Sequence, residues 1–80
     1  MNPHKQSPVL DLHGTKHANM EELVKNFILM NQEQMPLEII YGNSTAMYKL
    51  LTDCLKSMEV VYNDGYKNQY GRLLILSWKD

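Results

Sequence analysis

Two short apolar runs, each closed by a glycine turn and followed by a helical pattern, constrain the fold of this chain most. The runs cover residues 9–12 and 37–41, and they end at His13-Gly14 and at Gly42. Apolar runs of this length between turn residues are typical of buried strands. The sequence therefore predicts two consecutive strand–helix units.

The first helical pattern lies between Asn19 and Pro36. Asn19, followed three residues later by Glu22, is a capping signature, and a proline cannot continue a helix. We expect the helix to begin after this cap and to run to about residue 34. Its buried stripe is expected to comprise Leu23, Phe27 and Met30, with Val24 and Ile28 beside them.

The second helical pattern follows Gly42, where Asn43, Ser44 and Thr45 each offer an N-cap. Its expected buried stripe consists of Met47, Leu50, Leu51, Cys54, Leu55 and Met58. Four methionines at helical positions are interpreted as core filling: Met20, Met30, Met47 and Met58.

Two further apolar runs, residues 60–62 and 73–78, predict the third and fourth strands. The order β-α-β-α-β-β predicts an α+β fold, a two-layer sandwich with a four-stranded mixed sheet and two helices. Right-handed crossovers make the first three strands parallel, so that the turns at residues 13–14, 42–44 and 63–64 meet at one edge. One sheet face is left partly exposed. The residues expected to be largely buried are Leu23, Phe27, Leu51, Leu55 and Ile75.

Size and composition restrict the chain to one small domain. Of 80 residues, 44% are hydrophobic, and we expect residues 9–80 to form the domain behind a flexible arm, residues 1–8. The lone Cys54 excludes an internal disulfide framework, and no apolar run approaches the ~20 residues that span a bilayer. We expect a cytoplasmic protein with no membrane partner.

The charge balance limits how this chain could bind nucleic acid. Eight basic and nine acidic residues give a net charge of −1. This excludes a polybasic mode of binding, because such a mode needs a large excess of cations. Any nucleic-acid site must therefore be a local patch.

The first candidate site is the segment Asp11-Leu12-His13-Gly14. Side chains alternate along a strand, so Asp11 and His13 are expected to share a face. A carboxylate beside an imidazole can orient the ring, and such a pair can act as a general acid or base or bind a phosphate. The alternative is a polar pair that only caps the edge of the sheet.

The second candidate site is the turn Tyr41-Gly42-Asn43-Ser44-Thr45. A glycine lets the backbone approach a ligand closely, and the helix that follows presents N–H groups to an anion. The two hydroxyl groups could add donors. The alternative is an ordinary strand–helix turn with its N-cap.

Together, residues 10–14 (Leu-Asp-Leu-His-Gly) and 39–44 (Ile-Ile-Tyr-Gly-Asn-Ser) resemble the Smr, or small MutS-related, domain family. That family carries a leucine–aspartate–leucine–histidine–glycine motif after its first strand and a threonine–glycine–any–glycine motif after its second. Here Tyr41 stands in place of the threonine, and Ser44 stands near the second glycine. A polar loop with Asn68 and Gly71 before the last strand also fits, and the resemblance covers residues 9–78.

The resemblance implies a fold like the C-terminal domain of bacterial initiation factor three. It also implies binding to DNA or RNA, with endonuclease or nickase activity in which His13 is the general acid or base and Asp11 orients it. The residues expected to contact nucleic acid are Gly14, Lys16, Tyr41, Gly42, Asn43, Ser44, Thr45, Lys49, Lys67, Asn68 and Arg72.

Two other functions stay open beside this one, a non-catalytic nucleic-acid-binding module and a small protein–protein adaptor. No metal ligand and no cofactor is assigned, and the participation of a divalent metal is left open. An exposed edge strand could pair with a second copy, so a monomer and a weak homo-oligomer are both compatible with the sequence.

Overall fold

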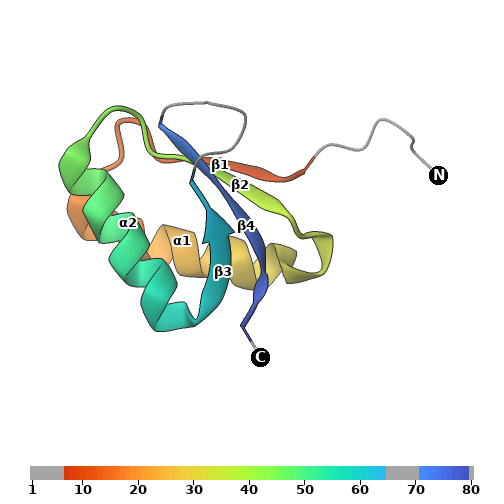
Figure 1. Cartoon of the computed structure of the whole chain (residues 1–80). Coiled ribbons are helices and arrows are strands. Elements are labelled where there is room, and N and C mark those ends of the chain that lie inside the picture. The colour runs from red at the N-terminus through yellow and green to blue at the C-terminus, as the bar shows by residue number, and fades with distance from the viewer. Residues whose placement is uncertain (1–6, 65–70, 80) are drawn as a thin grey trace.

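The computed structural model describes residues 7–64 and 71–79. It is an α+β fold with a four-stranded mixed sheet and two α-helices, as predicted (Figure 1). The elements in chain order are β1 (Val9–Asp11), α1 (His17–Asn31), the 3-10 helix η1 (Gln32–Gln34), β2 (Leu37–Ile40), α2 (Thr45–Met58), β3 (Val60–Asn63) and β4 (Arg72–Trp78).

The strand order in the sheet is β1-β2-β4-β3. β1 pairs with β2 in parallel, with Leu10 opposite Ile39, whereas β4 is antiparallel to both β2 and β3. The first three strands therefore run in the same direction, as predicted. The last strand is inserted between β2 and β3, and it thereby joins the two strand–helix units into one sheet.

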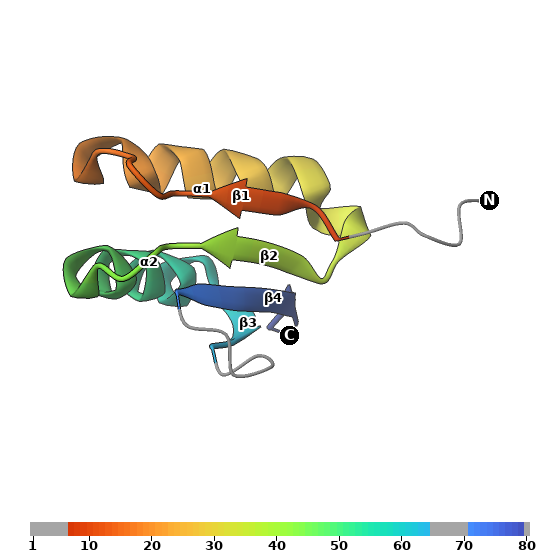
Figure 2. The same ribbon diagram turned by 90° about the horizontal axis from the view of Figure 1, so that it is seen from above.

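Both helices cover the same face of the sheet. Figure 2 looks onto the sheet, with α1 and α2 behind it. The burial of β2 alternates accordingly: Leu37 and Ile39 are fully buried, whereas Glu38 and Ile40 are half-buried on the opposite face. The core thus lies between the sheet and the helices, and no helix of the described residues covers the other face.

The packing of α2 agrees with its predicted stripe at most positions. The residues of the stripe that are buried are Met47, Leu51, Cys54 and Leu55. Met58 is partly buried and packs against the core. The predicted burial of Leu50 is wrong, because its side chain is 38% exposed on the flank of the helix.

The predicted stripe of α1 has the wrong phase. The buried residues are Met20, Val24 and Ile28, whereas Leu23 is 41% and Met30 81% exposed. Phe27 is partly buried against the core. Apolar residues occupy more than one side of this helix, and packing against the sheet selects the side that contains Val24.

The start of α1 also differs from its prediction. The helix begins at His17, two residues before the predicted cap Asn19, and Lys16 occupies the N-cap position without a side-chain hydrogen bond. The α-helix ends at Asn31, and η1 carries the chain to residue 34. In the described part of the chain, no helix is both long and apolar enough to cross a membrane.

Candidate functional site

The carboxyl ends of β1 and β2 meet at one edge of the sheet, as the crossovers predicted. A β-carbon placed on Gly42 would lie 3.5 Å from Cδ2 of the His13 ring. The bend that follows β3 also reaches this edge, because Asp64 and Gly42 line the same pocket. The edge therefore brings together residues from three separate parts of the chain.

Gly71 fixes the turn after β2 against the start of β4. Its carbonyl oxygen accepts hydrogen bonds from the backbone N–H groups of Tyr41 (2.7 Å) and Gly42 (3.1 Å). A β-carbon on Gly71, which has a φ of 80°, would lie 2.8 Å from the carbonyl oxygen of Gly42. No side chain fits at this distance, so the crossing of the two segments requires glycine here.

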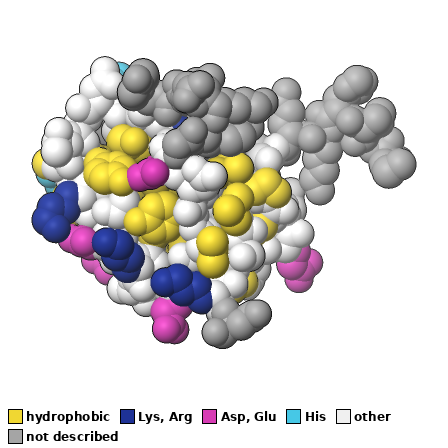
Figure 3. All heavy atoms as spheres, viewed as in Figure 1, with side chains coloured by type: hydrophobic (Ala, Val, Ile, Leu, Met, Phe, Trp, Pro, Cys, Tyr) yellow, Lys and Arg dark blue, Asp and Glu magenta, His cyan; other side chains and the backbone are white. Residues whose placement is uncertain are grey.

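A pocket of about 350 Å³ opens beside this crossing, and we name it the tyrosine pocket. The rings of Tyr41 and Tyr48 lie in it with centroids 5.2 Å apart and planes tilted by 53°. Figure 3 shows hydrophobic side chains gathered around an acidic group in this region, near the start of α2. The pocket is lined by Tyr41, Gly42, Asn43, Ser44, Thr45, Tyr48, Asp64 and Gly71.

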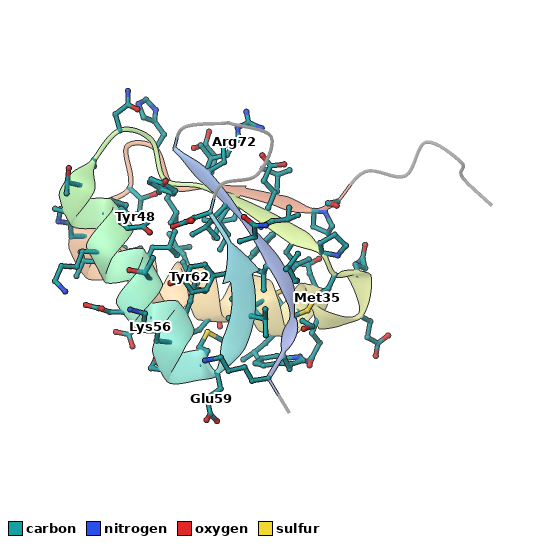
Figure 4. All side chains as sticks on the ribbon, in the orientation of Figure 1. Met35, Tyr48, Lys56, Glu59, Tyr62 and Arg72 are labelled. Carbon is teal, nitrogen blue, oxygen red and sulfur yellow. The ribbon has the colours of Figure 1, made fainter. Side chains whose placement is uncertain are left out.

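A hydrogen bond from Tyr48 holds the only carboxylate among these lining residues. The Tyr48 hydroxyl group donates to Oδ2 of Asp64, and this bond raises the pKa of Tyr48 to about 12. Burial raises the pKa of Tyr41 too, and the negative charge of Asp64 adds to the effect. Both phenols therefore stay protonated at neutral pH, beside a carboxylate that can accept further hydrogen bonds. Figure 4 shows Tyr48 near the start of α2.

The start of α2 forms one wall of the tyrosine pocket. The Ser44 hydroxyl oxygen accepts a hydrogen bond from the Met47 N–H at 3.0 Å, so this side chain is the N-cap of the helix. The turn is thus a strand–helix turn with its own N-cap, which was the alternative to a ligand site. A ligand could still bind there, because first-turn N–H groups have no partner within a helix and favour an anion.

The Asp11 carboxylate bonds to the backbone. Its Oδ1 accepts a hydrogen bond from the His13 N–H at 2.9 Å. β1 ends at Asp11, so His13 lies in the turn, and the alternation that predicted a shared face does not extend to it. Within the described residues no hydrogen bond joins the carboxylate to the imidazole ring. The catalytic roles of the two residues stay predictions.

Two of the basic residues that were expected to contact nucleic acid already have carboxylate partners. Arg72 forms an ion pair with Glu38, and Lys49 lies 3.4 Å from Asp53. Lys16, by contrast, is exposed in the turn after β1 and has no ion pair with any residue that the structure describes. Gly14 lies in the same turn, where a β-carbon would have nothing within 4 Å. Lys67 and Asn68 lie outside the described residues.

Three residues of the site were missing from the sequence-based selection. Tyr48 lies one helical turn after the cap Ser44, so helical periodicity could have placed it beside the turn. Asp64 follows the third predicted strand, where a site residue was expected. Gly71 was noted only for the loop before the last strand, and its contact with Gly42 depends on strand pairing that no local pattern contains.

Within the described ranges, no group of three or more histidine, cysteine, aspartate or glutamate residues could hold a metal ion. No family model, curated protein or solved structure matches this chain.

Proposed function

We propose that this chain binds single-stranded nucleic acid, DNA or RNA, at the edge formed by the turns after β1 and β2. One observation carries the proposal: Gly42 lines the tyrosine pocket and also lies against the His13 ring. An aromatic site and a site with basic side chains are thus adjacent. This is the combination that proteins use to bind the bases and the backbone of single strands.

The tyrosine pocket is suited to a base. Stacking of a base on an aromatic side chain is worth about 1–3 kcal/mol. The pocket's volume of about 350 Å³ lies within the usual range for small-ligand sites. Asp64 would repel a phosphate, so the base occupies the pocket and the phosphate lies outside it.

The turn after β1 is suited to the phosphate. It carries His13 and Lys16, and His17 follows them as the first residue of α1. Both helices begin at this edge, as Figure 2 shows, so the positive ends of both helix dipoles lie on the side of these residues. The charge is modest, which predicts weak, salt-sensitive binding.

Fluorescence anisotropy with labelled single-stranded oligonucleotides tests this proposal. The logarithm of the binding constant should fall linearly with the logarithm of salt concentration, by roughly 0.7 per phosphate contact. Lys16→Ala should reduce that slope by about 0.7. Lys56→Ala, at the far end of α2 (Figure 4), removes the same charge and should leave the slope unchanged. No binding of either nucleic acid at low salt would contradict the proposal.

Cleavage is a separate proposal that rests on the resemblance of residues 10–14 to the Smr motif. It assigns proton transfer to His13, with Asp11 as its positioning partner, and predicts that His13→Ala slows cleavage by about 10²–10⁴. Supercoiled plasmid and structured RNA, each with and without divalent metal, are the substrates to use. A wild-type protein that binds but cleaves neither substrate is a binding module.

A further inference from the structure

The tyrosine pocket contains a fixed acceptor, which nucleic-acid binding in general does not require. We propose that the pocket selects guanine among the four bases, with Asp64 accepting a pair of hydrogen bonds from its Watson–Crick edge. This inference rests on the proposed function and specifies which base the same site prefers. The residues that would make the selection are Asp64, its partner Tyr48 and the neighbouring ring of Tyr41.

Tyr48 prepares the carboxylate for a ligand. A phenol has one O–H donor, and that of Tyr48 is engaged by Oδ2 of Asp64. The bond orients the carboxylate next to the paired rings of Tyr41 and Tyr48. An ionised carboxylate offers about four lone-pair positions, so one bond from Tyr48 leaves room for further donors. The acceptor is therefore oriented, and the described residues leave it unsaturated.

The chemistry of the bases then decides the preference. Guanine presents its ring N1–H and its exocyclic 2-amino group side by side, as two adjacent donors. This pair matches a carboxylate in the way that an arginine fork does. Adenine and cytosine place an acceptor nitrogen beside their amino group, and uracil places its single N–H between two carbonyl groups. Guanine alone can satisfy both oxygens of Asp64 without bringing an acceptor against them.

A basic side chain is the competing occupant, because aromatic rings and a carboxylate also attract cations. The neighbouring turn decides between the two. Its exposed Lys16 would repel a basic peptide, whereas it attracts the phosphate that accompanies a base. The base is therefore the favoured occupant.

The test uses short uridine oligonucleotides that differ only at one central position. Guanosine there should bind more tightly than uridine, adenosine or cytidine by about 5- to 150-fold, the range of one bidentate contact. Inosine, which keeps the ring N–H and lacks the 2-amino group, should fall between guanosine and uridine. Anisotropy measures each affinity at a single salt concentration.

Variants assign the preference to Asp64. Asp64→Asn should abolish it and leave salt-dependent binding of the uridine oligonucleotide in place. Glu59→Gln makes the same chemical change at the opposite end of α2 (Figure 4) and should retain the preference. Tyr48→Phe keeps the ring and removes the positioning hydroxyl, so it should lower the preference. Circular dichroism verifies that each variant is folded.

The outcomes distinguish this inference from the proposed function. Equal affinity for all central bases, with salt-dependent binding intact, would overturn the guanine inference alone. Failure to bind any oligonucleotide would overturn both. Capture of N-acetyl-arginine amide by the wild type, lost in Asp64→Asn and accompanied by no base preference, would show that the pocket takes a cationic side chain instead.

Discussion

The turns after β1 and β2 have the same plan but differ in packing. Each follows a parallel strand, contains a glycine with a left-handed φ, 82° at Gly14 and 75° at Gly42, and leads into a helix. A β-carbon on Gly14 would meet nothing within 4 Å, whereas Gly42 lies between the ring of His13 and the backbone of Gly71. The second turn is part of the packed fold, and the first is open to solvent.

The helix caps repeat this contrast. Ser44 caps α2 through its hydroxyl group, whereas Lys16 precedes α1 without a side-chain bond. The packed turn therefore holds the tyrosine pocket in place, and the open turn exposes basic side chains next to it. This comparison indicates that one strand–helix turn provides shape and the other provides charge.

The largest difference should appear between a substitution at Gly71, which packs against the turn after β2, and one at Gly14, which lies in the turn after β1. Gly71→Ala combines left-handed strain of about 1–2 kcal/mol with a backbone clash of about 1–3 kcal/mol, a loss that could unfold a domain of this size. Gly14→Ala has the strain without the clash and should cost about 1 kcal/mol. Urea unfolding measures both. Equal losses would show that the two turns are packed alike.

The caps should differ by a smaller amount. Ser44→Ala removes the hydrogen bond to the Met47 N–H and should lower the free energy of unfolding by about 1 kcal/mol. Lys16→Ala removes no capping bond and should change that free energy by less than about 0.5 kcal/mol. If Lys16→Ala lowered the free energy of unfolding as much as Ser44→Ala, Lys16 would have to make a capping interaction, which would contradict the structure. Thermal unfolding of the two variants side by side provides the comparison.

The smallest effect should come from alkaline pH. The Tyr48–Asp64 bond raises the pKa of Tyr48 from its ordinary value of 10.0 to about 12, so its stabilising effect is complete below pH 10 and is lost as pH rises through 12. The effect is small because Tyr48 is near the surface. The difference in melting temperature between wild type and Tyr48→Phe should therefore shrink across this window. A difference in melting temperature that stays constant across this window would show that the Tyr48 hydroxyl group does not stabilise the fold through its bond to Asp64.

The two helices show what the sequence could and could not predict about the core. In α2, polar residues confine most of the apolar positions to one stripe, with Leu50 as the exception, and the burial of Leu51 and Leu55 was predicted correctly. In α1, Leu23, Phe27 and Met30 satisfy the same helical period as the residues that are buried. Period alone cannot choose between two such stripes, and contact with the sheet makes the choice.

The candidate site also could be predicted only in part, because some of its contacts join residues far apart in the sequence. Right-handed crossovers were sufficient to predict that His13 and Gly42 would share an edge. The tyrosine pocket also needs β4 between β2 and β3, because this pairing carries Gly71 to Gly42. The partners Tyr48 and Asp64 are separated by 16 positions and an intervening strand. Contacts of this kind depend on the assembled sheet and leave no local signal in the sequence.

In the proposed function, the packed turn and the open turn together form one binding site. A titration of the isotope-labelled protein with a short guanosine-containing single strand, followed by two-dimensional amide NMR, tests it most directly. The amide signals of His13, Gly42, Tyr48 and Gly71 should shift together with a single affinity. Shifts confined to the uncovered sheet face around Glu38 and Leu76, with these four signals unmoved, would contradict the claim.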